Sequence, residues 1–161
     1  MKEQINNIIS NVAVDTLEKL AFIFSFPEDE RDTTGHSSVT AAAISFTGPF
    51  TGNLVITFSV SALPELAANM LGLDDEDEVS LDQQYDALKE TINIICGNIL
   101  PAVFGKQSIF NIGSPEIITE AEAIKEAVKN DDETRAESIV RLALDEGECD
   151  LFLFVDNVKS A

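Results

Sequence analysis

The chain has 161 residues, 45% hydrophobic and 24% charged, and this composition predicts that residues 1–161 form a single globular domain. Its 29 acidic and 10 basic residues give a formal net charge of -19, which repels phosphate backbones and anionic lipids and argues against nucleic-acid and membrane partners. The N-terminal sequence does not resemble a secretory signal, and no uninterrupted apolar stretch is long enough to span a bilayer, so we expect a cytoplasmic protein.

The first half of the chain reads as a helix, a hairpin and a second helix. Apolar residues recur at helical intervals over residues 3–24. The following Pro- and charge-rich loop contains the only histidine, His36, which we interpret as a solvated residue. Residues 38–46 and 53–60 predict two antiparallel strands joined by a tight turn, and residues 61–71 predict a short helix.

An acidic run, LGLDDEDEVS, separates this short helix from the longest predicted helix. The run lacks the alternating oxygen ligands, central glycine and distal glutamate of a calcium loop, so we interpret it as a solvated loop. Ser80 is placed to cap a helix over residues 81–105, and Pro101 should kink or end that helix in its last turns.

The remaining sequence predicts mainly strands. Residues 108–118 predict a strand, and the acidic stretch over residues 120–133 predicts a short surface helix or an acidic excursion. Two further strands follow at residues 136–144 and 150–155, joined by a turn. Because the strands arrive mostly in pairs with short turns, we predict an α+β sandwich: a largely antiparallel β-sheet with two long helices on one face.

The helix over residues 81–105 has two distinct sides when its residues are placed about 100° apart. Its apolar side repeats at helical spacing through Leu88, Ile92, Ile95, Ile99 and Val103. The opposite, narrow face carries Asp86, Glu90, Asn93 and Gly97. Glycine removes the side-chain bulk that would keep another surface at a distance. This face is therefore typical of one that contacts something outside the fold.

The sequence lacks the residue motifs that are typical of most enzyme classes. The two cysteines, Cys96 and Cys149, lie in or beside apolar runs and are interpreted as buried, reduced thiols. No paired-cysteine or histidine-rich cluster predicts a metal site, and no Gly-rich phosphate loop or serine-hydrolase motif is present. With one histidine, a nucleophile and a neighbouring base are hard to assemble.

What remains is the pair Glu90 and Asn93. An asparagine amide can hold a water molecule by donating and accepting hydrogen bonds, and positioning of water is a recognised contribution to phosphoryl hydrolysis. A glutamate suits the binding of a lysine on a partner. The alternative is that Asp86, Glu90 and Asn93 are only the solvated side of an amphipathic helix, and their spacing alone does not decide between the two interpretations.

A family resemblance favours the first interpretation. The segment DALKETINIICGNILPAVFG, followed by NIGSPEI, resembles the motif of the CheC/CheX/FliY phosphatases of bacterial chemotaxis, in which Asp or Ser, Glu and Asn on a helix precede a distant proline. The matching positions are Asp86, Glu90, Asn93 and Pro115. The segment FTGNLVITFSVSALPELAANMLG also resembles the region before the catalytic helix of CheX proteins. The similarity covers most of residues 47–118 and, loosely, the first helix.

The resemblance implies a role for each of these residues. Asn93 would insert into a phosphorylated CheY-like receiver domain and orient the water that attacks its aspartyl phosphate. Glu90 would pair with a lysine of the receiver, and Asp86 and Gly97 would contact this partner. The Mg²⁺ ion of the reaction belongs to the receiver, and no cofactor is expected in this chain.

The single copy of the motif resembles CheX rather than CheC, whose pattern has two copies. Glu3 and Asn6 have the same spacing, but they lie at a chain start that can fray, with no residue at the preceding motif position, and we interpret them as a coincidental match. CheX proteins commonly dimerise by joining sheets, so the resemblance implies a homodimer. The acidic insert over residues 119–133 is longer than a plain strand connection and affects the sheet edge where a dimer could form.

Three hypotheses follow. The first is a response-regulator phosphatase, acting in chemotaxis or another two-component pathway. The second is a module that docks a receiver or flagellar-switch partner without hydrolysis. The third, a structural sheet-forming subunit, leaves the polar helix face unexplained. An Asn93 side chain that faces solvent beside Glu90, without internal hydrogen bonds, favours catalysis, whereas a buried and internally bonded one would exclude it.

Overall fold

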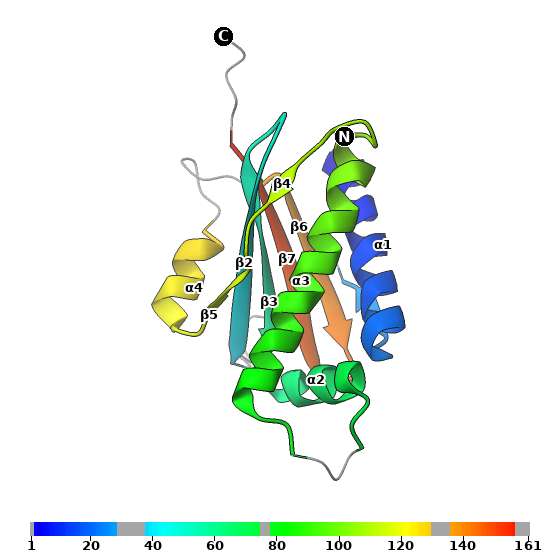
Figure 1. Cartoon of the computed structure of the whole chain (residues 1–161), viewed down its shortest axis with the longest axis vertical. Helices are drawn as coiled ribbons and strands as arrows, with labels where there is room; N and C mark the ends of the chain where they lie inside the picture. Colours follow the sequence, from blue (N-terminus) through cyan, green and yellow to red (C-terminus); the bar gives the residue numbers. More distant parts are fainter. Residues whose placement is uncertain (1, 29–37, 75–77, 130–135, 157–161) are drawn as a thin grey trace.

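The structure is a computed structural model that describes residues 2–28, 38–74, 78–129 and 136–156 (Figure 1). His36, the middle of the acidic run at residues 75–77 and the end of the acidic insert lie outside the described residues. The interpretation of His36 therefore stays a prediction.

A seven-stranded sheet forms the centre of the fold, with the spatial order β1-β6-β7-β3-β2-β4, and β5 also pairs with β2. Every pairing is antiparallel, as the sequence predicts. The strands are β1 Ser25–Pro27, β2 Val39–Thr47, β3 Gly52–Ser59, β4 Asn111–Ile112, β5 Glu116–Ile118, β6 Ser138–Leu144 and β7 Gly147–Val155.

The two long helices, α1 and α3, lie side by side on one face of the sheet, and α2 packs across their ends (Figure 1). This arrangement confirms the predicted α+β sandwich. The acidic insert contains a short helix, α4, near its start. Of the two structures predicted for this insert, the surface helix is therefore the one observed. The helices are α1 Lys2–Ala21, α2 Leu63–Leu71, α3 Leu81–Phe104 and α4 Ala121–Ala127, and a short 3₁₀ turn, Val60–Ala62, precedes α2.

Alternation along the strands divides the core between the two faces of the sheet. On β2, Ile44 and Phe46 point toward the long helices and are almost fully buried. Ala41, from the same strand, points to the opposite face and packs with Phe152 and with Ile124 of α4. Side chains of successive strand residues point to opposite faces, so one pattern supplies both layers. The long-helix face carries the larger cluster and holds α3 in place.

The edge strand β1 was not predicted from the sequence, and the first helix is shorter than predicted, since it ends at Ala21 instead of near Phe24. The helix ends at Ala21 because Phe22 adopts a left-handed conformation, with φ of 53°. The Phe22 N–H donates to the carbonyl of Glu18 at 3.0 Å, which closes the last turn. Glycine is the usual residue at this position, so a phenylalanine gives no sequence signal for a helix end.

The strand predicted at residues 108–118 is two short strands in the structure. β4 pairs with the end of β2 at Phe46 and Thr47, whereas β5 pairs nearer its start. Between them the Gly113 N–H donates to the carbonyl of Ser45 at 2.8 Å. This break brings Pro115 against α3, where it lines two hollows together with residues of the helix.

Pro101 lies inside α3, which continues past it and ends three residues later, at Phe104. Proline lacks the N–H that would bond to the carbonyl four residues earlier, which belongs to Gly97. Gly97 is exposed, so water can reach that carbonyl. By length and composition alone, α3 could also cross a membrane. Its apolar side is instead buried in the core of this fold.

Candidate functional site

A capping box fixes the start of α3, the helix that carries the candidate site. The Ser80 hydroxyl accepts a hydrogen bond from the Gln83 backbone N–H at 3.1 Å, and the Gln83 side chain accepts one from the Ser80 N–H at 2.9 Å. Reciprocal bonds of this kind satisfy two N–H groups that a helix start otherwise leaves free. Ser80 therefore caps the helix as predicted.

The predicted apolar side of α3 is the side that the core buries. Leu88, Ile92, Ile95 and Ile99 are each at most 1% exposed, and Val103 packs against the same cluster. Thr91 adds a tie to α2, because its hydroxyl donates to the Ala87 carbonyl at 2.8 Å and lies 3.5 Å from the Met70 sulfur. The helix is thus anchored along its length, and its opposite face has a fixed orientation.

That opposite face presents Asp86, Glu90, Asn93 and Gly97, all exposed. No hydrogen bond or ion pair connects the side chains of Asp86, Glu90 or Asn93 to other residues in the described part of the chain. A Cβ atom added at Gly97 would meet nothing within 4 Å. Packing within this chain therefore does not require a glycine there, and the polar groups beside it are available to a partner.

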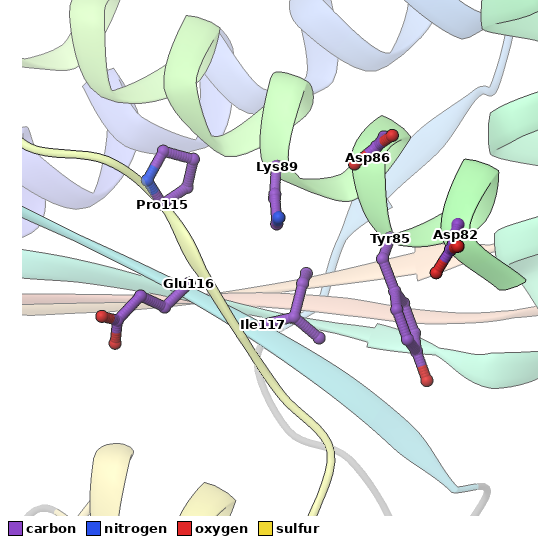
Figure 2. A pocket seen from close by; sticks show the side chains of 7 residues that line it. All are labelled: Asp82, Tyr85, Asp86, Lys89, Pro115, Glu116 and Ile117. Atoms are coloured by element: carbon purple, nitrogen blue, oxygen red, sulfur yellow. The ribbon is translucent and has the colours of Figure 1, made fainter.

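Two hollows lie between α3 and the segment that joins β4 to β5. One, of about 660 Å³, is lined by Asp82, Tyr85, Asp86, Lys89, Pro115, Glu116 and Ile117 (Figure 2). The other, of about 420 Å³, is lined by Asp86, Lys89, Glu90, Asn93, Gly113, Ser114 and Pro115. Asp86, Lys89 and Pro115 line both. We call the two hollows together the α3–β5 groove.

The other flank of the same face is apolar. Met70 and Leu71 of α2 line a smaller hollow, of about 240 Å³, with Ala87 and Glu90 of α3. Leu71 is 51% exposed, so it offers an apolar contact to an approaching surface. The polar face of α3 thus runs between an apolar rim at α2 and the charged α3–β5 groove. A partner that covered Asn93 would meet both.

The coincidental Glu3 and Asn6 pair has a different environment. Asn6 is half-buried, and its side-chain oxygen accepts a hydrogen bond from the hydroxyl of Ser138 on β6. An amide that is bonded within the fold is not free to hold a water molecule for a partner's reaction. The structure therefore agrees with the interpretation of this pair as a coincidental match.

Both cysteines lie in the core, and Cys96 offers no reactive thiol at neutral pH. Cys96 and Cys149 are both buried, and neither forms a disulfide with another described residue. Burial raises the pKa of the Cys96 thiol to about 12, because the thiolate is poorly solvated in the core. A thiolate nucleophile is thus not formed at Cys96. No group of three or more histidine, cysteine or carboxylate side chains that could hold a metal is present among the described residues.

Residues 40–138, more than half of the chain, match the family described as "Chemotaxis phosphatase CheX". The chain belongs to the CheX family. The match includes α3 and the Pro115 segment, so the family region contains both sides of the α3–β5 groove. No curated protein sequence matches the chain significantly.

Solved structures of CheX proteins share the fold at low sequence identity. CheX from Desulfovibrio desulfuricans is 17% identical, with a TM-score of 0.73, and the alignment covers 95% of this chain and 99% of that one. CheX from Vibrio vulnificus is 15% identical, with a TM-score of 0.71 and coverage of 97% and 99%. CheX in a CheX–CheY–BeF3–Mg²⁺ complex from Borrelia burgdorferi is 16% identical, with a TM-score of 0.66 and coverage of 92% and 96%.

Sequence reasoning about this CheX-family chain found the motif residues but missed the groove beside them. Tyr85 and Lys89 lie outside the narrow face that it considered, although both line the α3–β5 groove. The groove depends on where the segment between β4 and β5 crosses α3, and that placement comes from pairing with β2. The available signal was the unusual position of Lys89, a basic residue directly beside Glu90 in an acidic region.

Proposed function

We propose that this protein is a phosphatase that hydrolyses the aspartyl phosphate of a CheY-like receiver domain. The observation that carries the proposal is the Asn93 amide, which is exposed on a firmly anchored helix and has no hydrogen-bond partner among the described residues. Membership in the CheX family and the fold shared with a CheX protein that is solved in complex with CheY support the choice of partner.

In the proposed reaction, Asn93 enters the receiver's phosphorylation site and its amide holds one water molecule by donating and accepting hydrogen bonds. The water oxygen attacks the phosphorus atom, the bond from phosphorus to the aspartyl oxygen breaks, and inorganic phosphate leaves. The receiver's carboxylate is regenerated. Phosphoryl hydrolysis of this kind depends mainly on positioning and on charge stabilisation, so an amide is sufficient on the phosphatase side.

Glu90 would bind a lysine of the receiver and so fix the depth and angle at which Asn93 enters. Asp86, one turn before Glu90, and Gly97, one turn after Asn93, would form the rest of the contact face. The divalent cation of the reaction would be held by the receiver. This chain supplies no ligand cluster for it among the described residues.

The test is the rate at which a phosphorylated cognate CheY-like receiver loses phosphate, alone, with the wild-type protein and with Asn93→Ala. We expect acceleration by the wild type only, with binding of both proteins to the receiver. Binding of the wild type without acceleration would replace this proposal with the docking-module alternative. An active Asn93→Ala variant would refute the assigned mechanism.

We also propose that the protein forms a homodimer through the outer edge of β1, a strand that pairs only with β6 among the described residues. The sequence places phenylalanines at positions 22, 24 and 26, and their side chains are 72%, 57% and 61% exposed. Several large apolar side chains exposed together mark a contact surface. The other end of the sheet, at β4 and β5, borders the α3–β5 groove, so pairing there would cover the site, whereas pairing at β1 leaves it open.

Sedimentation equilibrium tests the dimer. Phe24→Ser should shift the mass toward the monomer and leave the phosphatase rate per chain unchanged. The matched control is Ile109→Ser, which removes an exposed apolar side chain next to β4, at the opposite end of the sheet from β1. A wild-type protein that is monomeric at tens of micromolar would refute the dimer proposal without affecting the phosphatase proposal.

A further inference from the structure

Lys89 is the only positively charged side chain in a long acidic part of the sequence. Residues 32–105 include ten aspartates and glutamates, and Lys89 is their single lysine or arginine. This region includes all of α2 and α3, and therefore the whole exposed face that carries Asn93. The one positive charge in the region lies within the candidate site itself.

The structure places Lys89 where the two hollows of the α3–β5 groove meet, because it lines both of them. It lies directly after the buried Leu88, beside Glu90 and one turn before Asn93. Its side chain leaves α3 between Pro115 and Tyr85 and is half-buried (Figure 2). The aliphatic stem of a lysine can pack on such surroundings while its ammonium group stays accessible.

Several carboxylates lie near Lys89, but none of those in the described residues forms an ion pair with its ammonium group. Asp82, Asp86 and Glu116 line the same hollow. The Glu116 carboxylate points away from the groove (Figure 2). The ammonium group thus has hydrogen-bond donors available to a ligand that enters from outside.

We propose that Lys89 is a specificity-determining residue that binds an anionic oxygen of the docked receiver, supplied by a receiver carboxylate or by the phosphoryl group. This inference rests on the proposed function. Glu90 and Lys89 are neighbours of opposite charge that share one hollow of the groove, but only Glu90 also lines the hollow at α2 and only Lys89 also lines the hollow beside Tyr85. Together they would favour a receiver that presents a cation to one flank and an anion to the other, and would disfavour the reverse arrangement.

The physical need for such a residue follows from net charge. A chain with a formal charge of -19 repels a dianionic phosphoryl group, and Asp86 and Glu90 concentrate that repulsion at the site. A single ammonium group near the point of contact is screened less than distant charges are once the interface excludes water. Lys89 would therefore act mainly on docking, while Asn93 acts on the chemical step.

The experiment measures the Kd of the full chain for the cognate CheY-like receiver, both unmodified and loaded with beryllofluoride and Mg²⁺ as a phosphoryl mimic. KM and kcat for dephosphorylation are measured in parallel. Lys89→Gln removes the charge, Lys89→Glu reverses it and Lys89→Arg preserves it. Lys125→Glu is the matched control, because it makes the same charge change on α4, where Lys125 forms only an exposed ion pair with Glu122.

We expect Lys89→Gln to raise KM about 10-fold and Lys89→Glu to raise it about 100-fold, with kcat changed less than about twofold and near-normal values for Lys89→Arg. Weaker binding of both receiver forms would assign the anion to a receiver carboxylate. Weaker binding of the beryllofluoride form alone would assign it to the phosphoryl group.

Lys89→Gln and Lys89→Glu variants with the same Kd and KM as Lys125→Glu would overturn the inference, provided that the wild type binds and hydrolyses. In that case the proposed function would stand. A wild-type protein that neither binds nor dephosphorylates the cognate receiver would overturn both. The two failures are therefore distinguished by the wild-type measurement.

Discussion

The helices α1 and α3 lie on the same face of the sheet, and each carries a glutamate followed three residues later by an asparagine. On α1, the Asn6 side chain is half-buried and is bonded to Ser138 of β6. On α3, the Asn93 side chain is exposed and has no such partner among the described residues. The same short pattern thus gives one amide that holds the fold together and one that is available to a partner.

The difference comes from what surrounds each helix. Asn6 faces the hollow where α1 meets β6 and the end of β1. Asn93 faces a groove whose far wall is the Pro115 segment, and the neighbouring rim at α2 is apolar. A motif of three or four residues specifies a helix face, whereas the packing of the helix decides whether that face meets the fold or the solvent.

The largest expected effect separates the two asparagines. Asn93→Ala should lower the dephosphorylation rate of a CheY-like receiver about 100-fold or more, because a group that positions the reacting water is lost. Asn6→Ala should stay within about twofold of the wild-type rate. Comparable losses in the two variants would show that the exposed amide is not special, and the comparison between α1 and α3 would fail.

Charge reversal at the two glutamates tests docking. Glu90→Lys should weaken receiver binding by about 10- to 100-fold, since an ion pair with the receiver is replaced by repulsion at a contact that excludes water. Glu3→Lys makes the same change in net charge on an exposed residue of α1 and should have little effect. Titration calorimetry with both variants measures this. Equal weakening would indicate a general effect of net charge rather than a contact at Glu90.

Much of this fold follows from the sequence because its strands and helices have strong periodic patterns. The hairpin of β2 and β3, the pair β6 and β7, and α3 with its Ser80 cap were all predicted near their observed positions. β1 was not predicted, since it has three residues and follows a helix end formed by Phe22 rather than glycine. Short edge strands depend on partners that are distant in sequence, and periodicity does not report those partners.

The candidate site was predictable only on the helix itself. Residues on one face of α3 are fixed relative to one another by helical geometry, so Asp86, Glu90 and Asn93 could be grouped from spacing alone. The groove next to them needs the turn at Gly113, whose N–H bonds to Ser45, and no local pattern predicts that contact. The role proposed for Lys89 depends on its neighbours across the groove, Pro115 and Glu116, which the spacing along α3 does not reveal.

Substitution of Gly97 separates folding from docking on the exposed face of α3, because Gly97→Ala should stabilise the fold but weaken receiver binding. Gly97→Ala should raise the free energy of unfolding by about 0.5–1 kcal/mol, since alanine is the better helix former and the added Cβ meets nothing within 4 Å. It should also weaken receiver binding about 10-fold if a partner packs closely here. Urea denaturation and calorimetry on the same samples test both. Gain of stability with unchanged binding would remove Gly97 from the contact face.

The smallest expected effect on activity concerns the bonded asparagine, whose loss should change stability alone. Ser138 is fully buried, so Asn6→Ala should leave its hydroxyl without a partner and cost about 1–3 kcal/mol of unfolding free energy. Ser138→Ala should cost less, about 1 kcal/mol, because the half-buried Asn6 amide can turn to water. Both variants should keep the wild-type dephosphorylation rate. If Asn6→Ala costs no more than Ser138→Ala, the amide is not a structural group, and the reason for contrasting it with Asn93 is lost.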